Sequence, residues 1–404
     1  MSEKKKTPAL RFDGFTDDWE QRKLGNYIIE YTETTKTNNQ YPVLTSSRKG
    51  IFFQKDYYNG NQVASDDNTG YNIVPYGYFT YRHMSDDEIF HFNINDIAEN
   101  GIVSTLYPVF TTDSNLDSRY LQYQLNYGYE FKKFANLQKQ GGSRTYMYLS
   151  KLKQLDITIP KSIEEQVQIS EYLVKLDNLI TLHQRKCDKL KNLKKSCLEK
   201  MFPKNGETLP EVRFEGFTDD WEQRKFGEIV DKYEDPVPTP HNGYTRLGIR
   251  SHAKGTFHSY VEAGKELETA KMHRVASGNF IVNITFGWEH AVAITNENDA
   301  GKLVSHRFPQ FKFAENMNPN FFRYVVTDEN FRHHLWLASP GGAGRNRVLK
   351  ISEMLEYLMN YPSKNEQDVI SHFFMQLDNL ITLHQRKVEK LQNIKKSMLE
   401  KMFV

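Results

Sequence analysis

The sequence predicts a mixed α/β (α+β) fold. Two segments of similar fold would be separated by a long antiparallel two-helix coiled coil, with a pseudo-two-fold internal repeat. Two observations predict this. The line RFDGFTDDWEQRK at residues 11–23 returns as RFEGFTDDWEQRK at residues 213–225, and LDNLITLHQRK at residues 176–186 returns unchanged at residues 377–387. The chain is therefore a direct duplication with a period of about 200 residues, a feature that decides the fold class.

The composition is that of an ordinary folded protein. The 404 residues are enough for two or more domains, and a formal net charge of +2 with 26% charged residues points to no particular partner. A nucleic-acid-binding protein often has a strongly basic domain, so any basic surface here must be local. Cys187 and Cys197 lie in one helical segment and give no disulfide framework, which favours a reducing compartment.

No targeting or membrane segment is apparent in the sequence. The opening MSEKKKTPALRF has no apolar core of a signal peptide, and no run reaches the roughly 18 apolar residues of a membrane span. We therefore expect a soluble cytoplasmic protein without a membrane partner.

The line that closes each half is predicted to be a long helix. Its apolar positions step by four and three residues, as in a coiled-coil seam. The seam positions are Ile169, Leu173, Leu176, Ile180, His183, Cys187 and Leu190 in the first copy, and Ile370, Phe374, Leu377, Ile381, His384, Val388 and Leu391 in the second. Ser162 with Glu165, and Ser363 with Glu366, match the S-x-x-E capping box. Each helix would have about 40 residues and a length of roughly 60 Å.

A seam of this kind needs a partner, and the simplest partner is the other copy. A pseudo-two-fold axis perpendicular to the helices would set them antiparallel, with the two variable segments at opposite ends of a rod. His183 and His384 share one seam position. They are either a metal or pH-sensing pair or polar residues that fix the register, and we favour the second because no other ligand spacing accompanies them. Cys187 corresponds to Val388 and is interpreted as a small apolar residue.

The repeat divides the chain into six segments. They are an N-terminal frame segment at 1–25, a first variable domain at 26–160, a central spacer helix at 161–204, a linker with the repeated frame segment at 205–227, a second variable domain at 228–362, and a C-terminal spacer helix at 363–404. Both variable domains mix short β-branched and aromatic runs with Gly, Asn and Asp turns, and each also has helical stretches. Weak correspondences, such as GIVS at Gly101 with GKLVS at Gly301, indicate a shared fold with divergent loops.

These features together resemble the specificity subunit of type I restriction-modification systems. The resemblance covers essentially the whole chain. It is strongest in GFTDDWEQRKLG and GFTDDWEQRKFG, in EEQVQISEYLVKLDNLITLHQRK and NEQDVISHFFMQLDNLITLHQRK, and in the Gly-rich loops upstream of each spacer helix. The stretch VNITFGWEHAVAI at residues 282–294 also looks like part of one recurrent type of target recognition domain.

The resemblance implies a non-catalytic chain that acts through partners. Two target recognition domains would each read one half of a bipartite double-stranded DNA sequence. The spacer helices would separate them and hold two modification (methyltransferase) subunits, which bind S-adenosylmethionine and methylate adenine. Restriction/translocase subunits would use ATP and cut DNA. No cofactor is expected in this chain itself.

Candidate DNA contacts lie in loops that combine cationic, amide or hydroxyl side chains with a Gly turn, since these groups reach base edges and phosphates. In the first domain they are Ser46, Ser47, Arg48, Lys49, Tyr81, Arg82, His83, Arg144 and Tyr146. In the second domain they are Arg250, His252, Lys254, Asn283, Trp288, His290, His306, Arg307, Arg345, Asn346 and Arg347. Arg144 and Arg345 lie beside Gly-rich segments and are expected to contact phosphates. For each residue taken singly, the alternative is a surface or core role without a ligand.

Two other functional classes stand against this interpretation. A DNA methyltransferase with its own recognition domains would need a cofactor loop and a catalytic motif. GGAGRNR at Gly341 lacks the G-x-G-x-x-G spacing, and NPNF at Asn318 lacks the second proline of the amino-methyltransferase motif. The sequence also contains no G-x-x-x-x-G-K-[ST] phosphate loop. The second class is a coiled-coil scaffold without a DNA role.

Overall fold

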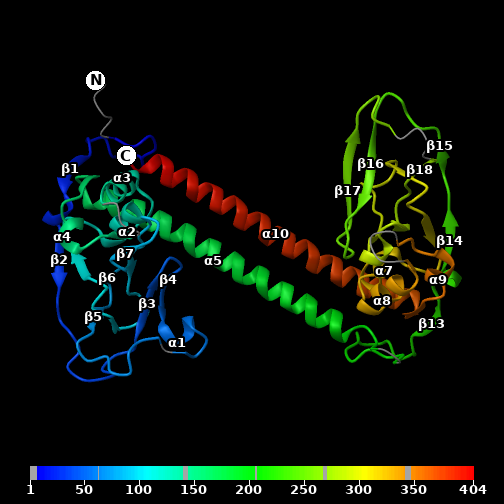
Figure 1. Ribbon diagram of the computed structural model, residues 1–404, viewed down its shortest axis with the longest axis horizontal. Coiled ribbons are helices and arrows are strands. Elements are labelled where there is room, and N and C mark those ends of the chain that lie inside the picture. The colour runs from blue at the N-terminus through cyan, green and yellow to red at the C-terminus, as the bar shows by residue number, and fades with distance from the viewer. Residues whose placement is uncertain (1–6, 62, 140–143, 205–206, 267–270, 342–346) are drawn as a thin grey trace. The chain divides into compact units, whose positions relative to one another are not determined.

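Figure 1 shows the computed structural model of the chain, which describes residues 7–61, 63–139, 144–204, 207–266, 271–341 and 347–404. The chain divides into two compact units, residues 1–185 with 385–404 and residues 186–384. Each unit combines a mixed α and β segment with one part of helix α5 (Ile163–Lys200) and one part of helix α10 (Lys364–Met402). The mixed fold class predicted from the sequence is confirmed.

The first unit is built around a four-stranded antiparallel sheet in the order β2–β10–β6–β8. Its strands are β2 (Ile28–Tyr31), β6 (Phe79–Thr80), β8 (Asn93–Ile94) and β10 (Val109–Thr112). Further pairs are β1 (Glu20–Lys23) with β12 (Asp156–Ile159), β3 (Leu44–Ser47) with β4 (Gly50–Phe53), β5 (Asn72–Pro75) with β9 (Asn100–Val103), and β7 (Met84–Ser85) with β11 (Thr145–Tyr146). Its short helices are η1 (Leu24–Asn26), α1 (Gln54–Tyr57), α2 (Ser118–Tyr127), α3 (Tyr129–Leu137) and α4 (Leu149–Leu152).

The second unit has a four-stranded antiparallel sheet, β14–β22–β19–β20, and a five-stranded sheet, β15–β18–β21–β16–β17, in which β16 and β21 are parallel. The strands are β13 (Glu222–Lys225), β14 (Val230–Tyr233), β15 (Pro236–Val237), β16 (Tyr244–Ile249), β17 (Thr256–Val261), β18 (Met272–Arg274), β19 (Phe280–Val282), β20 (Val292–Ile294), β21 (Leu303–Ser305), β22 (Gln310–Phe313) and β23 (Leu358–Tyr361). The short helices are α6 (Phe226–Ile229), η2 (Gly287–Glu289), α7 (Pro319–Val325), α8 (Glu329–Leu337) and α9 (Ile351–Leu355).

Aromatic packing and local capping explain why these segments fold as they do. Phe79 on β6 and Phe110 on β10 are fully buried and stack with ring centroids 4.6 Å apart. The side chain of Asp117 caps the start of α2. The helix ends at Gly128, where a Cβ atom would lie 2.4 Å from the carbonyl oxygen of Gln124. Glycine is therefore the residue that fits between α2 and α3.

The two units repeat the same central sheet. In the first unit β10 pairs with β2 and β6, and in the second β22 pairs with β14 and β19. The frame strands also match, because β1 lies antiparallel to β12 and β13 lies antiparallel to β23. The duplication is therefore one of fold as well as of sequence, as predicted. The other strands differ, since they form the five-stranded sheet in the second unit and separate pairs in the first.

Within the first unit, α5 and α10 pack antiparallel. Lys395 of α10 donates to Asp177 of α5 at 2.6 Å. Further along α10, the carbonyl of Lys401 accepts from the backbone N–H of Leu10 at 2.9 Å. The next residue, Arg11, binds Glu165 near the start of α5, so the end of α10 lies near the start of α5. Rising residue numbers on α10 thus accompany falling numbers on α5.

The second unit repeats this geometry. Lys194 of α5 donates to Asp378 of α10 at 2.5 Å. The carbonyl of Lys200, at the end of α5, accepts from the N–H of Val212 at 2.9 Å. The next residue, Arg213, binds Glu366 near the start of α10, so the end of α5 lies near the start of α10. The antiparallel helix pair predicted from the seam is confirmed in each unit.

Two details of the helices refine the sequence interpretation. Cys187 is a free, buried cysteine, as expected for a small apolar seam residue. The predicted capping box forms only in part. The N–H of Glu165 donates to Ser162 Oγ at 3.2 Å, but the Glu165 carboxylate binds Arg11 instead of turning back to the cap. Over the described residues, none of the helices combines the length and the apolar character needed to cross a membrane.

Candidate nucleic-acid interface

One exposed surface of the first unit begins at the hairpin turn between β3 and β4. Ser47 Oγ donates to the carbonyl of Gly50 and accepts from the N–H of Lys49, both at 3.1 Å, so the turn is fixed by its own side chain. Gly50 has a φ of 122°, a value that favours glycine. Arg48 and Lys49 are both exposed at this tight turn.

The pairing of β7 with β11 adds aromatic side chains to this surface. The ring of His83 lies 6.0 Å from that of Tyr146 and 5.1 Å from that of Tyr148. Tyr146 and Tyr148 stack on each other at 5.9 Å, and both are exposed. Arg82, next to His83 in the chain, is exposed as well. The tyrosines offer aromatic faces of the kind on which nucleic-acid bases stack.

Neighbouring carboxylates hold the arginines of this surface. Arg48 Nη2 donates to Asp87, and Arg144 Nε donates to Asp86 at 2.9 Å. The hydrogen bond from Arg48, with a second one from Ser85, lowers the pKa of Asp87 to about 2. The acidic turn therefore brings together two arginines that are far apart in the sequence.

Three candidates of the first unit lie in the interior instead. Tyr81 is fully buried, its hydroxyl donates to the carbonyl of Met147 at 2.8 Å, and burial raises its pKa. Ser46 is buried and hydrogen-bonded to neighbouring strands. His83 is also buried, with Nδ1 on the carbonyl of Leu106, and shows only part of its ring to the tyrosine stack. The side chains of Tyr81 and Ser46 point into the core and leave little surface for a ligand, so DNA contact by these two residues stays a prediction that their burial does not favour.

The exposed surface of the second unit surrounds the turn between β16 and β17. The N–H of His252 donates to the carbonyl of Glu289 at 2.9 Å, and Ser251 Oγ donates to the Glu289 carboxylate at 2.6 Å. These bonds join the turn to the η2 segment and leave His252 and Lys254 exposed beside it. Trp288 within that segment is half-buried, and its indole N–H donates to a backbone carbonyl at 3.2 Å.

Aromatic rings hold two arginines of this second surface. The guanidinium carbon of Arg250 lies 5.3 Å from the ring centre of Phe257, and that of Arg347 lies 4.7 Å from the ring centre of Trp336. His333 stacks on Trp336 with ring centroids 6.0 Å apart and planes 11° apart. Phe257 and Trp336 are exposed, so both are cation–π contacts at the surface.

The turn between β21 and β22 brings His306 and Arg307 to the same surface. Both residues are exposed. The carbonyl of Arg307 accepts from the N–H of Ile284 at 3.0 Å, and the carbonyl of Ile284 accepts from the N–H of Leu349 at 2.8 Å. The loop that starts at Ile284 and leads to η2 therefore lies next to Arg307 and to the segment of Arg347. Arginines from three distant parts of the sequence become neighbours of one loop.

Two further candidates of the second unit are buried. Asn283 Oδ1 accepts from the N–H and hydroxyl of Thr285 at 3.1 and 2.6 Å, which shapes the loop. His290 Nε2 lies 2.7 Å from a backbone carbonyl, and desolvation lowers the pKa of this imidazole. Both side chains are buried and hydrogen-bonded within the protein, so they hold the loop in place, and direct DNA contact by them stays a prediction that their burial does not favour. Arg345 and Asn346 lie outside the described residues.

Sequence reasoning missed the residues that hold these cations. Asp86 and Asp87 belong to the acidic run DDE, which closely follows the candidate segment YRH. Trp336 and His333 lie in HHLW on helix α8. The sequence criterion is a cationic, amide or hydroxyl side chain in a loop with a Gly turn, which excludes carboxylates and residues on a helix. The acidic run beside YRH was the available signal.

Each unit thus presents an exposed surface of arginine and aromatic side chains, groups of the kinds that contact phosphates and bases in nucleic-acid-binding proteins. The family model described as "Type I restriction modification DNA specificity domain" matches the chain twice, at residues 13–192 and 218–393. The chain therefore belongs to the type I restriction-modification DNA specificity family.

Individual relatives agree with this membership. The type I restriction enzyme MjaVIII specificity subunit of Methanocaldococcus jannaschii is 23% identical over 408 residues, which cover 95% of this chain and 91% of the relative. The crystal structure of the type I restriction-modification S subunit from M. genitalium has a TM-score of 0.58 at 13% identity and covers 98% of this chain and 99% of its own. The HsdS subunit from Thermoanaerobacter tengcongensis has a TM-score of 0.45 at 13% identity, with 95% and 96% covered. The M. genitalium structure shows that the fold is shared.

The family is one of DNA specificity and not of catalysis. Membership implies DNA and the other parts of a restriction-modification complex as partners.

Proposed function

We propose that this chain is the specificity subunit of a type I restriction-modification complex and reads a bipartite double-stranded DNA target. Residues 26–160 and 228–362 act as two target recognition domains, one for each half-site. The observation that carries the proposal is that one family-defined frame occurs twice, while the exposed loops on it differ. A common frame with different loops suits two different half-sites.

The two surfaces supply the chemistry that such reading needs. Arginine donates pairs of hydrogen bonds to guanine in the major groove and also holds phosphates. The first surface offers Arg48 and Arg144 beside two exposed tyrosines. The second offers Arg250 and Arg347 on aromatic rings, with Arg307 next to them. The different settings of the arginines support different target sequences.

The repeated frame supports docking of two modification subunits. Arg11 binds the Glu165 carboxylate through Nε at 2.6 Å and Nη2 at 2.8 Å. Arg213 binds Glu366 in the same way, at 2.7 Å through each nitrogen. Because the two frames carry the same contacts, each presents an equivalent surface on which one copy of the same partner docks.

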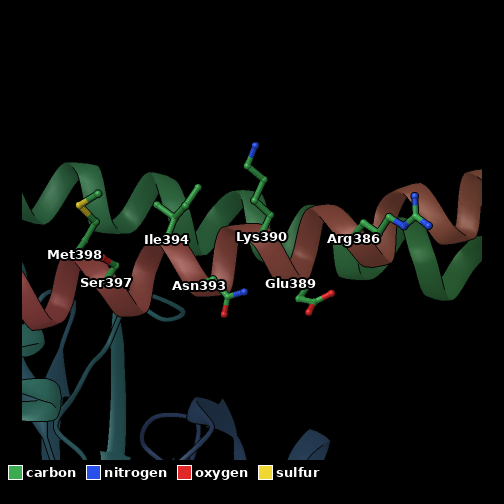
Figure 2. A pocket seen from close by; sticks show the side chains of 7 residues that line it. All are labelled: Arg386, Glu389, Lys390, Asn393, Ile394, Ser397 and Met398. Atoms are coloured by element: carbon green, nitrogen blue, oxygen red, sulfur yellow. The ribbon is translucent and has the colours of Figure 1, made fainter. Parts of the chain in front are cut away.

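An open groove on α10 is a candidate for part of this docking surface. It has a volume of about 450 Å³ and is lined by Arg386, Glu389, Lys390, Asn393, Ile394, Ser397 and Met398 (Figure 2). Ile394 and Met398 pack against the core of the first unit, whereas Figure 2 shows Glu389 and Asn393 on the opposite side of the helix. Ile394 and Met398 are only partly buried, so the groove combines some apolar surface with polar side chains, a combination that suits a protein partner.

Catalysis belongs to the partners in this proposal. The modification subunits bind S-adenosylmethionine and methylate adenine, and the restriction/translocase subunits use ATP. The present chain selects the DNA sequence on which they act, in the cytoplasm, where the DNA lies.

The test compares the purified chain with its assembled complex. The chain alone, given labelled S-adenosylmethionine and DNA, should transfer no methyl group, and addition of the modification subunit should produce adenine methylation at one bipartite motif. Methylome sequencing of cells with and without the chain identifies that motif. Methyl transfer by the chain alone would favour a self-contained methyltransferase. An assembled complex without salt-dependent DNA binding would favour a scaffold.

A further inference from the structure

Three consecutive acidic residues follow β7, and each is paired with a different cation. Asp86 accepts from Arg144 Nε at 2.9 Å, Asp87 accepts from Arg48 Nη2, and Glu88 forms an ion pair with Lys139. The three cations come from separate places: the β3–β4 turn, the end of the α3 segment and the start of β11. One short acidic segment therefore gathers three cations, two of which are the arginines Arg48 and Arg144 of the first surface.

The backbone conformation of the acidic segment directs its three carboxylates toward different partners. Ser85 Oγ donates to Asp87 at 2.8 Å, and the N–H of Ile89 donates to Asp87 at 3.3 Å, so the turn is held by its own hydrogen bonds. Glu88 has a left-handed φ of 59°, which residues other than glycine adopt rarely and which points to a functional constraint. The bend lets successive carboxylates face different cations.

Two of these ion pairs are exposed on both sides, and in the third Glu88 is partly buried. The exposed fractions of the side chains are 56% for Arg48 with 46% for Asp87, and 50% for Arg144 with 67% for Asp86. Exposed ion pairs contribute little free energy, so a DNA phosphate can replace a carboxylate at low cost. While the carboxylates remain, however, they cancel the positive charge that would otherwise release counterions from DNA.

The second surface holds its arginines in another way. Arg250 and Arg347 lie over the rings of Phe257 and Trp336. An aromatic ring fixes a guanidinium group and leaves its charge in place. The first surface thus orients its arginines with carboxylates, which reduce the local positive charge, whereas the second uses aromatic rings, which leave that charge in place.

We propose that the acidic segment Asp86–Glu88 is a specificity determinant of the first surface, which competes with DNA phosphates for Arg48, Lys139 and Arg144. Non-target DNA is bound almost entirely through phosphates, so it loses most from this competition. A target half-site also offers base edges, and a guanidinium with five N–H donors can contact a base while one carboxylate holds it. The segment therefore widens the gap between target and non-target affinity. This inference rests on the proposed DNA-reading function.

The experiment measures the salt dependence of DNA binding by the complex with the modification subunit. The probes are the duplex with the motif found by methylome sequencing and the same duplex with its first half-site scrambled. The variant is D86N/D87N/E88Q. The control is E30Q/D96N, which removes two carboxylates of the first unit that pair with Lys153 and Arg119 and that belong neither to the frame strands nor to the first surface.

We expect the triple variant to bind the scrambled duplex more tightly, with a slope of log affinity against log salt that is steeper by up to about 2.7, or about 0.9 for each freed cation. Its preference for the target should fall on the order of tenfold, whereas the control keeps the wild-type slope and preference. D86N alone retains the turn contacts of Asp87 and should steepen the slope by about 0.9.

Three results would overturn the inference. The first is a slope of the triple variant and of D86N equal to that of the control. The second is a higher preference for the target in the triple variant. The third is a wild-type complex that does not prefer its methylated motif at any salt concentration. That last result would also refute the proposed function, whereas the first two leave it standing.

Discussion

At the scale of single residues, the frame is held by two buried charged groups. Glu165 and Glu366 are each about 1% exposed, and each accepts hydrogen bonds from Nε and Nη2 of an arginine, Arg11 or Arg213. Trp19 adds an indole hydrogen bond to Glu165 at 3.3 Å. The hydrogen bond to the carboxylate raises the pKa of each arginine, which keeps the pair ionised. A buried carboxylate tolerates this position only while its partner remains.

We predict that Arg11→Ala destabilises the first unit by about 3–5 kcal/mol, because it leaves the Glu165 charge buried and unpaired. Urea unfolding of the full chain measures the effect. Arg22→Ala, which removes an exposed ion pair with Glu20, serves as the control and should cost less than about 1 kcal/mol. Equal losses for the two variants would contradict the prediction.

Two tyrosines link stability to alkaline pH. Tyr123 donates to Asp177 at 2.7 Å, and Tyr324 donates to Asp378 at 3.0 Å. Burial is the main cause that raises the pKa of both phenols, and the neighbouring carboxylate adds to it. An unfolded tyrosine has a pKa of about 10. The folded chain therefore keeps these protons when the unfolded chain loses them, so their contribution to stability is complete below pH 10 and declines above it.

We predict that wild-type stability falls as the pH rises from 10, and that Tyr123→Phe makes this fall less steep. At neutral pH the same variant should lose about 1 kcal/mol, because the hydrogen bond to Asp177 is missing. Urea unfolding at several pH values between 7 and 11 measures both effects. Tyr129→Phe, at an exposed position, is the control. A wild-type stability that stays level to pH 11 would contradict the assignment.

At the scale of elements, repeated ion pairs set the register of the two long helices. Asp177 pairs with Lys395, and Lys194 pairs with Asp378. In the internal repeat Asp177 corresponds to Asp378 and Lys194 to Lys395, so the two ion pairs are equivalent. The point midway between Asp177 and Lys194 on α5 falls between residues 185 and 186, and the point midway between their partners on α10 falls between residues 386 and 387. Equal insertions at both points leave both ion pairs intact, because each ion pair lies within one unit.

We predict that seven residues inserted at both midpoints lengthen the non-specific gap in the DNA target by about three base pairs. Seven helical residues add about 10.5 Å, and DNA rises about 3.4 Å per base step. The seven-residue length preserves the seam. Methylome sequencing measures the gap. An insertion in α5 alone shifts one helix against the other and should abolish activity, and an unchanged gap in the double insertion would show that the helices are not a ruler.

At the scale of the whole molecule, we expect each recognition surface to read its half-site independently of the other. Each unit has its own core, its own frame and its own exposed arginines. We predict that replacing residues 26–160 with the first domain of another family member changes one half-site only. Methylome sequencing of cells with the chimera reads both half-sites at once. A swap that altered both together would contradict two autonomous surfaces.

Single arginines should follow the same division. Arg48→Ala or Arg82→Ala should affect only the half-site of the first domain, and Arg250→Ala or Arg307→Ala only that of the second. The loss of a bidentate base contact costs about 1–3 kcal/mol and relaxes one position of the motif. Arg144→Ala should instead weaken binding to all sequences alike and flatten the salt dependence, as for a phosphate contact. Binding assays on scrambled half-sites distinguish the two patterns.

The sequence by itself determined the duplication and the long helices, and it predicted their antiparallel pairing from symmetry and the family from resemblance. These features are local or periodic. A repeated line is visible without any structure, and a seam of period 3.5 requires only that a helix bury one side against a partner. The mixed α and β content of the variable domains follows in the same way from alternating runs and turn residues.

Only the tertiary structure decided which candidate side chains face outward and what holds them. Tyr81 and Arg82 are neighbours in the sequence, yet one is fully buried and the other exposed. The packing of the segment between β6 and β7 decides this, because it brings the Tyr81 hydroxyl to the carbonyl of Met147, a residue far away in the sequence. The contact of Arg144 with Asp86 likewise joins segments that are distant in the chain. No local pattern encodes such a contact, since it exists only once the segments have packed together.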